Sequence, residues 1–277
     1  MIWYRVYLLL LLVVLPITGH SSTVDVIKVH SQKMNKNIPV TLILPDSYEN
    51  SVEQLPVLYL LHGAGGNYRD WNSNSDIAKL ADLYNMIVVC PDGERTSWYF
   101  DSPIDPKFQY ESFVAKDCVQ YIDKHYRSRS TREGRAISGL SMGGHGAMFL
   151  GIRHKDVFSI VVVMSGGVDI RPFPNSWDIK KRLGDIETHK DNWDKYTVIN
   201  LAKDLKDGDL AISLDCGDRD FFLKVNRALH QQLLQAGISH KYIECPGVHN
   251  WTYWQESLKR QMPFIDSQFR QGTKSVK

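Results

Sequence analysis

The chain has 277 residues, of which 43% are hydrophobic and 23% are charged, as in an ordinary globular protein. Its formal net charge of +2, with no basic cluster, is too mild to indicate nucleic acid or an anionic membrane as a partner. A chain of this length can fold as one large α/β domain.

The first 22 residues are typical of a secretory signal peptide. A lone basic residue precedes an almost uninterrupted leucine and valine run over residues 6–15, and small and polar residues follow. The run is well short of the ~20 apolar residues that a membrane-spanning helix needs, so we expect no stable membrane anchor. We predict cleavage between Gly19 and Thr23, a mature domain over residues 23–277, and a secreted or periplasmic location.

The mature chain begins with two segments of strand character, residues 24–29 and 38–44, which we expect to pair as an antiparallel edge. From residue 57 on, short apolar runs alternate with segments of helical periodicity, which predicts a mostly parallel sheet flanked by helices. The further strands are predicted over residues 57–61, 87–90, 135–138, 160–164, 210–215 and 241–245. Helices are predicted over residues 75–84, 111–126, 142–153, 222–233 and from about 252 onward.

Two less regular segments complete the chain. Residues 166–209 are predicted to form a cap-like insertion of short helices over the sheet. Residues 271–277 are expected to be a disordered tail.

The four cysteines, Cys90, Cys118, Cys216 and Cys245, are too few for a disulfide-framed fold. A bridge between Cys216 and Cys245 is conceivable because both end strands that could be neighbours, but buried free thiols are the favoured interpretation. The cysteine spacing matches no zinc pattern, and we expect no metal and no cofactor.

Residues 139–143 read Gly-Leu-Ser-Met-Gly. The Gly-x-Ser-x-Gly pattern, between a predicted strand and a predicted helix, is typical of a sharp turn that lifts a serine hydroxyl above a sheet. The alternative is that Ser141 only caps the helix, since serine is a favoured N-cap residue. Residues elsewhere in the chain are needed to decide between the two.

A nucleophilic serine needs a histidine base and a carboxylate, which occur in the order serine, acid, histidine in α/β-hydrolases. His249 lies directly after the last predicted strand, where the base belongs. Asp218 and Asp220 both lie in the loop after the preceding strand, whereas Asp215 still belongs to that strand. The pattern alone leaves Asp218 and Asp220 open as the acid, because either could instead cap the next helix.

Acyl transfer also needs N–H donors for the oxygen that becomes negative. Met142 follows the serine and would supply one donor. The loop His-Gly-Ala-Gly-Gly over residues 62–66 is similar to the HGGG-type motif and would supply the other from Ala64. A phosphate-binding loop is disfavoured because no Gly-Lys-Ser/Thr ending follows. His62 is expected to brace this loop, and His145 to pack in the core.

Taken together, these residues resemble the secreted esterase family of the α/β-hydrolase fold. That family includes feruloyl, acetylxylan and small-ester esterases, with S-formylglutathione hydrolases and mycolyltransferases as more distant relatives. The matching stretches are residues 59–63, 91–93, 97–99, 121–123, 135–144, 215–221 and 247–251. The resemblance implies a single α/β-hydrolase domain without a cofactor, with Ser141 as nucleophile and His249 as base. It also selects Asp220, because the family's acid ends a Gly-x-x-Asp segment.

The resemblance implies a serine ester hydrolase that takes a small-molecule or oligosaccharide ester carrying an acetyl, feruloyl or other short acyl group. Trp98, Tyr99 and Trp251 are expected to line the cleft, since aromatic faces suit sugar rings or a feruloyl group. Three alternatives stay open: an acyltransferase that uses the same acyl-enzyme, a thioesterase like S-formylglutathione hydrolase, and a binding protein that has lost catalysis.

Overall fold

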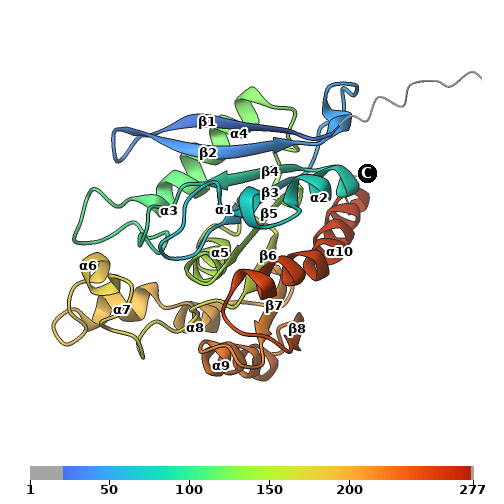
Figure 1. The fold of residues 1–277 in the computed structure, drawn as a ribbon. Coiled ribbons are helices and arrows are strands. Elements are labelled where there is room, and N and C mark those ends of the chain that lie inside the picture. The colour runs from blue at the N-terminus through green and yellow to red at the C-terminus, as the bar shows by residue number, and fades with distance from the viewer. Residues whose placement is uncertain (1–20, 276–277) are drawn as a thin grey trace, which may run out of the picture.

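Residues 21–275, the part of the chain that the computed structural model describes, form an eight-stranded sheet between two layers of helices (Figure 1). The strand order is β1-β2-β4-β3-β5-β6-β7-β8. Strand β2 pairs antiparallel with β1 and with β4, and all other pairs are parallel, so the predicted sheet and its antiparallel edge are confirmed. The strands are β1 Thr23–Ser31, β2 Lys36–Leu44, β3 Val57–Leu61, β4 Ile87–Pro91, β5 Arg135–Leu140, β6 Ile160–Met164, β7 Ala211–Gly217 and β8 His240–Cys245.

Apart from the last, the helices lie in the connections between successive strands, as a parallel sheet requires. They are α1 Asp70–Asn74, α2 Ile77–Tyr84, α3 Tyr110–Ser112, α4 Val119–His125, α5 Met142–Arg153, α6 Ile179–Leu183, α7 Lys190–Tyr196, α8 Val198–Leu201, α9 Leu223–Gln235 and α10 Trp251–Ser275. A π-helical segment, Phe113–Cys118, joins α3 to α4, so the predicted helix over residues 111–126 is present but irregular.

Both faces of the sheet are buried, and β3 shows how. Its Val57, Tyr59 and Leu61 lie in the core that includes residues of α4, α5 and α9. Its Leu58 and Leu60 point the other way, into the core that includes residues of α2 and α10. Successive side chains of a strand alternate between faces, so a strand covered on both sides is apolar throughout.

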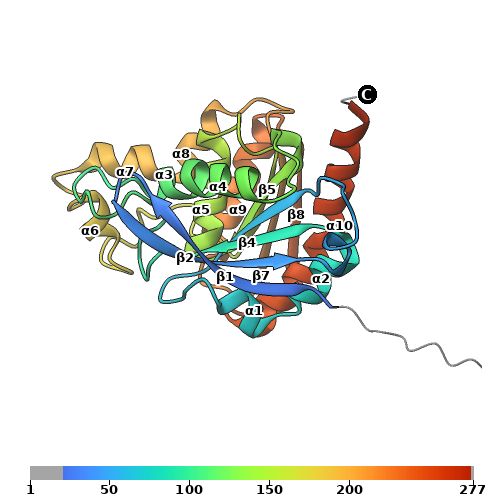
Figure 2. The ribbon, with the colours of Figure 1, turned by 90° about the horizontal axis from the view of Figure 1, so that it is seen from above.

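The insertion over residues 166–209 contains α6, α7 and α8, and its first two helices lie at one end of the molecule (Figures 1 and 2). Its Ile179, Leu183 and Trp193 are buried in the same core as the side chains of α5. The insertion is therefore built into the main hydrophobic core.

The helices differ from the prediction at two places. The sequence pattern missed the short helix α1, whose Trp71 is buried against the sheet. Residues 271–275, expected to be disordered, continue α10 to Ser275. The prediction rested on the general tendency of chain ends to be poorly ordered, which does not hold for these residues.

Within the described residues, all four cysteines are free thiols, and no helix is long and apolar enough to cross a membrane. The predicted signal peptide lies almost entirely outside the described residues.

Candidate active site

Ser141 lies at the sharp turn between β5 and α5, with φ 57° and ψ −117°. A non-glycine residue in this region carries backbone strain, which persists only where the surrounding structure enforces it. The turn is held by the Ser141 N–H, which donates to the Met164 carbonyl at 3.0 Å, and by its own carbonyl, which accepts from the His145 N–H at 3.0 Å. This strained turn is the predicted strand, serine, helix arrangement.

The two glycines of the motif are required by packing. A Cβ at Gly139 would lie 2.4 Å from the Gly143 carbonyl oxygen. A Cβ at Gly143 would lie 2.5 Å from the carbonyl oxygen of Leu61. Both clashes are with backbone that cannot swing aside, so the helix can approach the sheet this closely only without side chains at these positions.

His249 and Asp220 complete a hydrogen-bonded chain with Ser141. His249 Nε2 lies 2.9 Å from Ser141 Oγ, and its Nδ1 lies 2.8 Å and 3.0 Å from the two carboxylate oxygens of Asp220. An ionised carboxylate can only accept, so Nδ1 carries the proton and the Nε2 lone pair faces the serine hydroxyl. The Asp220 side chain is fully buried and that of His249 is 13% exposed, so water competes little for the Nδ1 bond.

The structure separates the three aspartates that the sequence placed near one another. Asp220 alone contacts His249, and it also accepts the Phe222 N–H at 2.8 Å, so it caps the turn before α9 as well. Asp218 accepts the N–H of Gly247 at 2.9 Å. This bond links the loop after β7, here called the acid loop, to the loop after β8 that carries His249. Asp215 is buried within β7, where it accepts hydrogen bonds from side chains of α10.

The two backbone N–H groups predicted to bind a negative oxygen are those of Met142 and Ala64. The N–H of Met142 opens α5, and the first N–H groups of a helix have no partner within it. In the loop after β3, the N–H groups of Gly65 and Gly66 donate to the carbonyls of Arg95 and Gly63. Among the described residues, the Ala64 N–H has no such acceptor, and Ala64 lines the same cavity as Ser141.

His62 and Tyr99 hold this loop in place. His62 donates from Nδ1 to the Gly63 carbonyl at 2.8 Å and accepts the Gly93 N–H at Nε2 at 2.8 Å. Burial lowers the pKa of His62, so the ring stays neutral and keeps this tautomer. Burial raises the pKa of Tyr99, whose hydroxyl donates to the His62 carbonyl at 3.1 Å. His62 thus braces the loop, as predicted.

A cavity of about 300 Å³ opens over Ser141. Trp251 lines it, as expected, but Trp98 and Tyr99 do not. The prediction that these two line the cleft is wrong, because Trp98 is 1% exposed, Tyr99 is 0% exposed, and both lie in the hydrophobic core. A ring that fills the core has no face left for substrate, so their part is to support other residues.

Four lining residues were not singled out from the sequence: Asp70, Trp177, Phe221 and Trp254. Three of them come from segments without a motif, namely α1, the insertion and α10. Phe221 had a usable signal, since it directly follows Asp220. Aromatic residues of this kind are more often core than binding residues, and the sequence alone does not show which ring faces a cavity.

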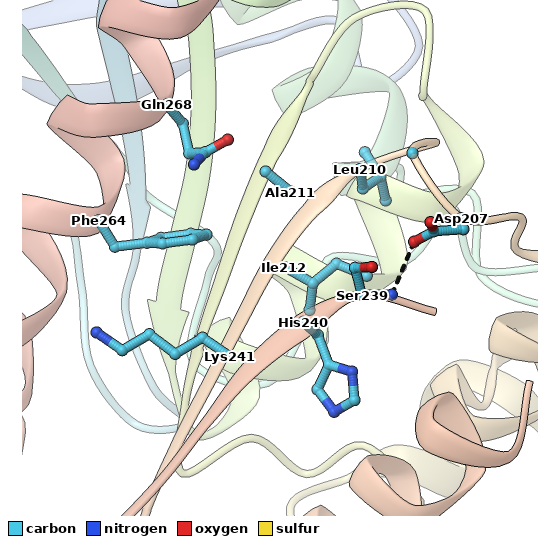
Figure 3. A pocket seen from close by; sticks show the side chains of 10 residues that line it. Asp207, Leu210, Ala211, Ile212, Ser239, His240, Lys241, Phe264 and Gln268 are labelled. Carbon is cyan, nitrogen blue, oxygen red and sulfur yellow. Dashed lines mark hydrogen bonds between the residues drawn. The ribbon is translucent and has the colours of Figure 1, made fainter. Parts of the chain in front are cut away.

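A larger cavity, of about 540 Å³, lies at the other end of the sheet, where β7 and β8 begin (Figure 3). Asp207, Ser239 and His240 line it, but they do not repeat the arrangement at Ser141. His240 uses Nδ1 on the Ile238 carbonyl at 2.7 Å and Nε2 on His230 at 2.7 Å, so neither ring nitrogen serves Ser239. Size therefore does not identify the active site here. No group of three or more metal-ligating side chains occurs within residues 21–275.

The arrangement at Ser141 defines a class of protein. A hydroxyl, an imidazole and a carboxylate form one hydrogen-bonded chain at the carboxyl ends of the parallel strands β5, β8 and β7. Such a set can add an alcohol oxygen to a carbonyl carbon and stabilise the oxyanion that forms. These are the groups that a serine hydrolase of the α/β-hydrolase fold requires.

Comparison with known proteins identifies the family. Residues 31–265 match the family described as "Putative esterase". An acetyl esterase from Caldicellulosiruptor saccharolyticus is 30% identical over 251 residues, which are 84% of this chain and 94% of that protein. A solved ferulic acid esterase superposes with a TM-score of 0.78 and 31% identity, over 91% of this chain and 100% of that one. The chain belongs to this esterase family and is a carboxylic ester hydrolase.

The fold is shared more widely than the sequence. FphF, a fluorophosphonate-binding serine hydrolase of Staphylococcus aureus, superposes with a TM-score of 0.79 at 20% identity, over 89% of this chain and 99% of that one.

Proposed function

We propose that this protein is a secreted serine esterase that hydrolyses acetyl, feruloyl or other short acyl esters of carbohydrates. The observation that carries the proposal is the continuous chain from Ser141 Oγ through His249 to Asp220, which opens into an aromatic-lined cavity. The similarity to an acetyl esterase and to a ferulic acid esterase supports the choice of ester.

In the first half-reaction, Ser141 Oγ attacks the ester carbonyl carbon while His249 Nε2 takes the hydroxyl proton. The carbonyl oxygen becomes an oxyanion, which the N–H groups of Met142 and Ala64 bind. The bond from carbon to the alcohol oxygen then breaks. His249 gives its proton to that oxygen, so a neutral alcohol leaves and the acyl group stays on Ser141.

In the second half-reaction, a water molecule takes the place of the alcohol. His249 removes a proton from the water as its oxygen attacks the acyl carbon. The bond to Ser141 Oγ breaks, the proton returns to that oxygen, and the free acid leaves. Asp220 stays ionised throughout, where it fixes the tautomer of His249 and stabilises its cation.

A panel of acetyl, butyryl and feruloyl esters, free and attached to xylan fragments, tests the proposal. We expect carbohydrate acetates or feruloylated fragments to have the highest kcat/KM. Uniformly low turnover of all carbohydrate esters, with fast turnover of a thioester, would contradict the proposed substrate class. Acyl transfer to an added sugar in preference to water would make the protein an acyltransferase.

The export proposal is separate. The apolar run of residues 6–15 supports secretion, and the mature protein is expected to begin between Gly19 and Thr23. N-terminal sequencing of protein from the medium or periplasm checks this. An intact N-terminus in a protein that stays in the cytoplasm would refute it.

A further inference from the structure

One wall of the active-site cavity is a pair of stacked aromatic rings. The rings of Trp177, from the insertion, and Phe221, from the acid loop, lie 5.8 Å apart at an interplanar angle of 17°. Phe221 is 52% exposed, whereas its neighbour Phe222 is buried in the core. The exposed Phe221 ring and the Trp177 ring stacked on it together present apolar surface to the cavity.

The backbone that carries Trp177 is held at an energetic cost. Trp177 and Asp178 are consecutive non-glycine residues with positive φ, 46° and 55°. The left-handed conformation costs such residues roughly 1 kcal/mol or more each. Trp98 Nε1 donates to the Trp177 carbonyl at 3.1 Å, and Thr96 Oγ1 donates to Asp178 at 3.2 Å. The buried Trp98 therefore fixes the turn that presents Trp177, and strain of this kind persists mainly at functional sites.

The position of Phe221 relative to His249 decides which half of the ester the pair meets. Its ring lies 4.1 Å from the imidazole, centre to centre. The alcohol oxygen must lie at His249 Nε2 to receive the proton, so the rest of the alcohol contacts the exposed groups beside the imidazole. Of the other rings packed on His249, that of Phe222 is buried in the core, and that of Trp254 lines the cavity but is only 8% exposed.

We propose that Trp177 and Phe221 form a binding platform for the alcohol half of the ester, and that this platform takes the apolar face of a sugar ring. The inference rests on the proposed function. A flat aromatic surface packs against the C–H-rich face of a pyranose ring, while the ring's hydroxyl groups remain in water. The platform then selects the carbohydrate and leaves the acyl group to the remainder of the cavity.

The test uses the acyl-enzyme that all acetate esters share. A residue that contacts only the alcohol changes kcat/KM for acylation but leaves the hydrolysis rate of the acetyl-enzyme unchanged. For Phe221→Ala we expect about a tenfold fall in kcat/KM for an acetylated methyl xyloside relative to ethyl acetate. Because Phe221 also contacts His249, hydrolysis of the acetyl-enzyme, measured after rapid acetylation by an activated ester, reports any effect on the base, and the fall for the xyloside should exceed it.

Phe264→Ala is the matched control, because Phe264 lines the distant cavity of Figure 3. It should leave the ratio between the two acetates unchanged. An equal loss for both acetates in Phe221→Ala, or no change at all, would overturn the platform.

Binding of unesterified methyl xyloside to the Ser141→Ala protein separates this idea from the proposed function. Weaker binding after Phe221→Ala supports the platform even if the wild type hydrolyses no ester. Unchanged binding refutes it.

Discussion

Replacing Asp220 by asparagine changes one atom of the hydrogen-bonded chain and almost none of its shape. The Asp220 carboxylate accepts from His249 Nδ1 through both oxygens and from the Phe222 N–H through Oδ1. Asparagine can keep the bond to Phe222 with its own oxygen, but its NH₂ group then faces Nδ1. Two donors cannot pair, so the imidazole is expected to move its proton to Nε2. That proton occupies the position that must accept the hydroxyl hydrogen of Ser141.

The size of the effect follows from losing the base while keeping the oxyanion donors. We expect kcat on an aryl acetate at neutral pH to fall by about 10⁴, or about 5 kcal/mol of transition-state stabilisation. Because the fold-supporting bond to Phe222 is kept, the melting temperature should change by only a few degrees, roughly that of a 1 kcal/mol effect. Steady-state kinetics and thermal unfolding of the purified variant measure both quantities.

Asp218→Asn is the matched control, since it makes the same chemical change only two residues away. Asp218 accepts the Gly247 N–H at 2.9 Å, and an asparagine oxygen can accept it as well. Its activity should stay within about tenfold of wild type, the factor that corresponds to one hydrogen bond. A larger loss for Asp218→Asn than for Asp220→Asn would refute the assignment of the acid.

Three further changes test the supports of the site. Gly143→Ala would put a Cβ 2.5 Å from the Leu61 carbonyl oxygen. It should therefore lower the free energy of unfolding by about 1–3 kcal/mol and abolish turnover. A variant as stable and active as wild type would contradict this. Tyr99→Phe removes the donor to the His62 carbonyl, so kcat should fall several-fold with little change in KM, and an unchanged kcat would exclude a role in holding the loop. Burial lowers the pKa of His145 from the ordinary histidine value of about 6.5 to about 4. The unfolded chain therefore takes up a proton between these two pH values that the folded protein does not, and stability should fall by up to about 3 kcal/mol as pH drops through this range. In urea unfolding at several pH values, His145→Asn should reduce the dependence of the unfolding free energy on pH. The same dependence as in wild type would contradict the role given to His145.

The sequence predicts those parts of the site that depend on local geometry. The glycines at 139 and 143 carry information because backbone of other elements lies against them, so the turn at Ser141 could be inferred from a short pattern. His249 could be placed because the order of strands and loops in the chain sets its position. Residues alone left the acid open, since Asp218 and Asp220 share one loop and only the resemblance to a family selected Asp220.

What the sequence does not reveal is which aromatic ring faces the cavity. Trp98 and Tyr99 lie in an aromatic-rich loop and were expected at the surface of the cleft, yet they are core residues that support Trp177 and the loop after β3. Trp177 and Phe221 are 44 residues apart in the chain, yet their rings stack. No periodic pattern in the sequence predicts this contact. Burial of large rings is decided by tertiary contacts, which is why these assignments failed.

The central claim is that Ser141 is an activated nucleophile. A fluorophosphonate probe reacts with serines that have a base at hydrogen-bonding distance, as His249 Nε2 is from Ser141 Oγ at 2.9 Å. Mass spectrometry of the labelled protein should find one adduct, on the peptide that contains Ser141. The Ser141→Ala protein, with an unchanged melting temperature, should take up no probe and turn over no ester. An adduct on another residue, or ester turnover retained by a folded Ser141→Ala protein, would contradict the claim.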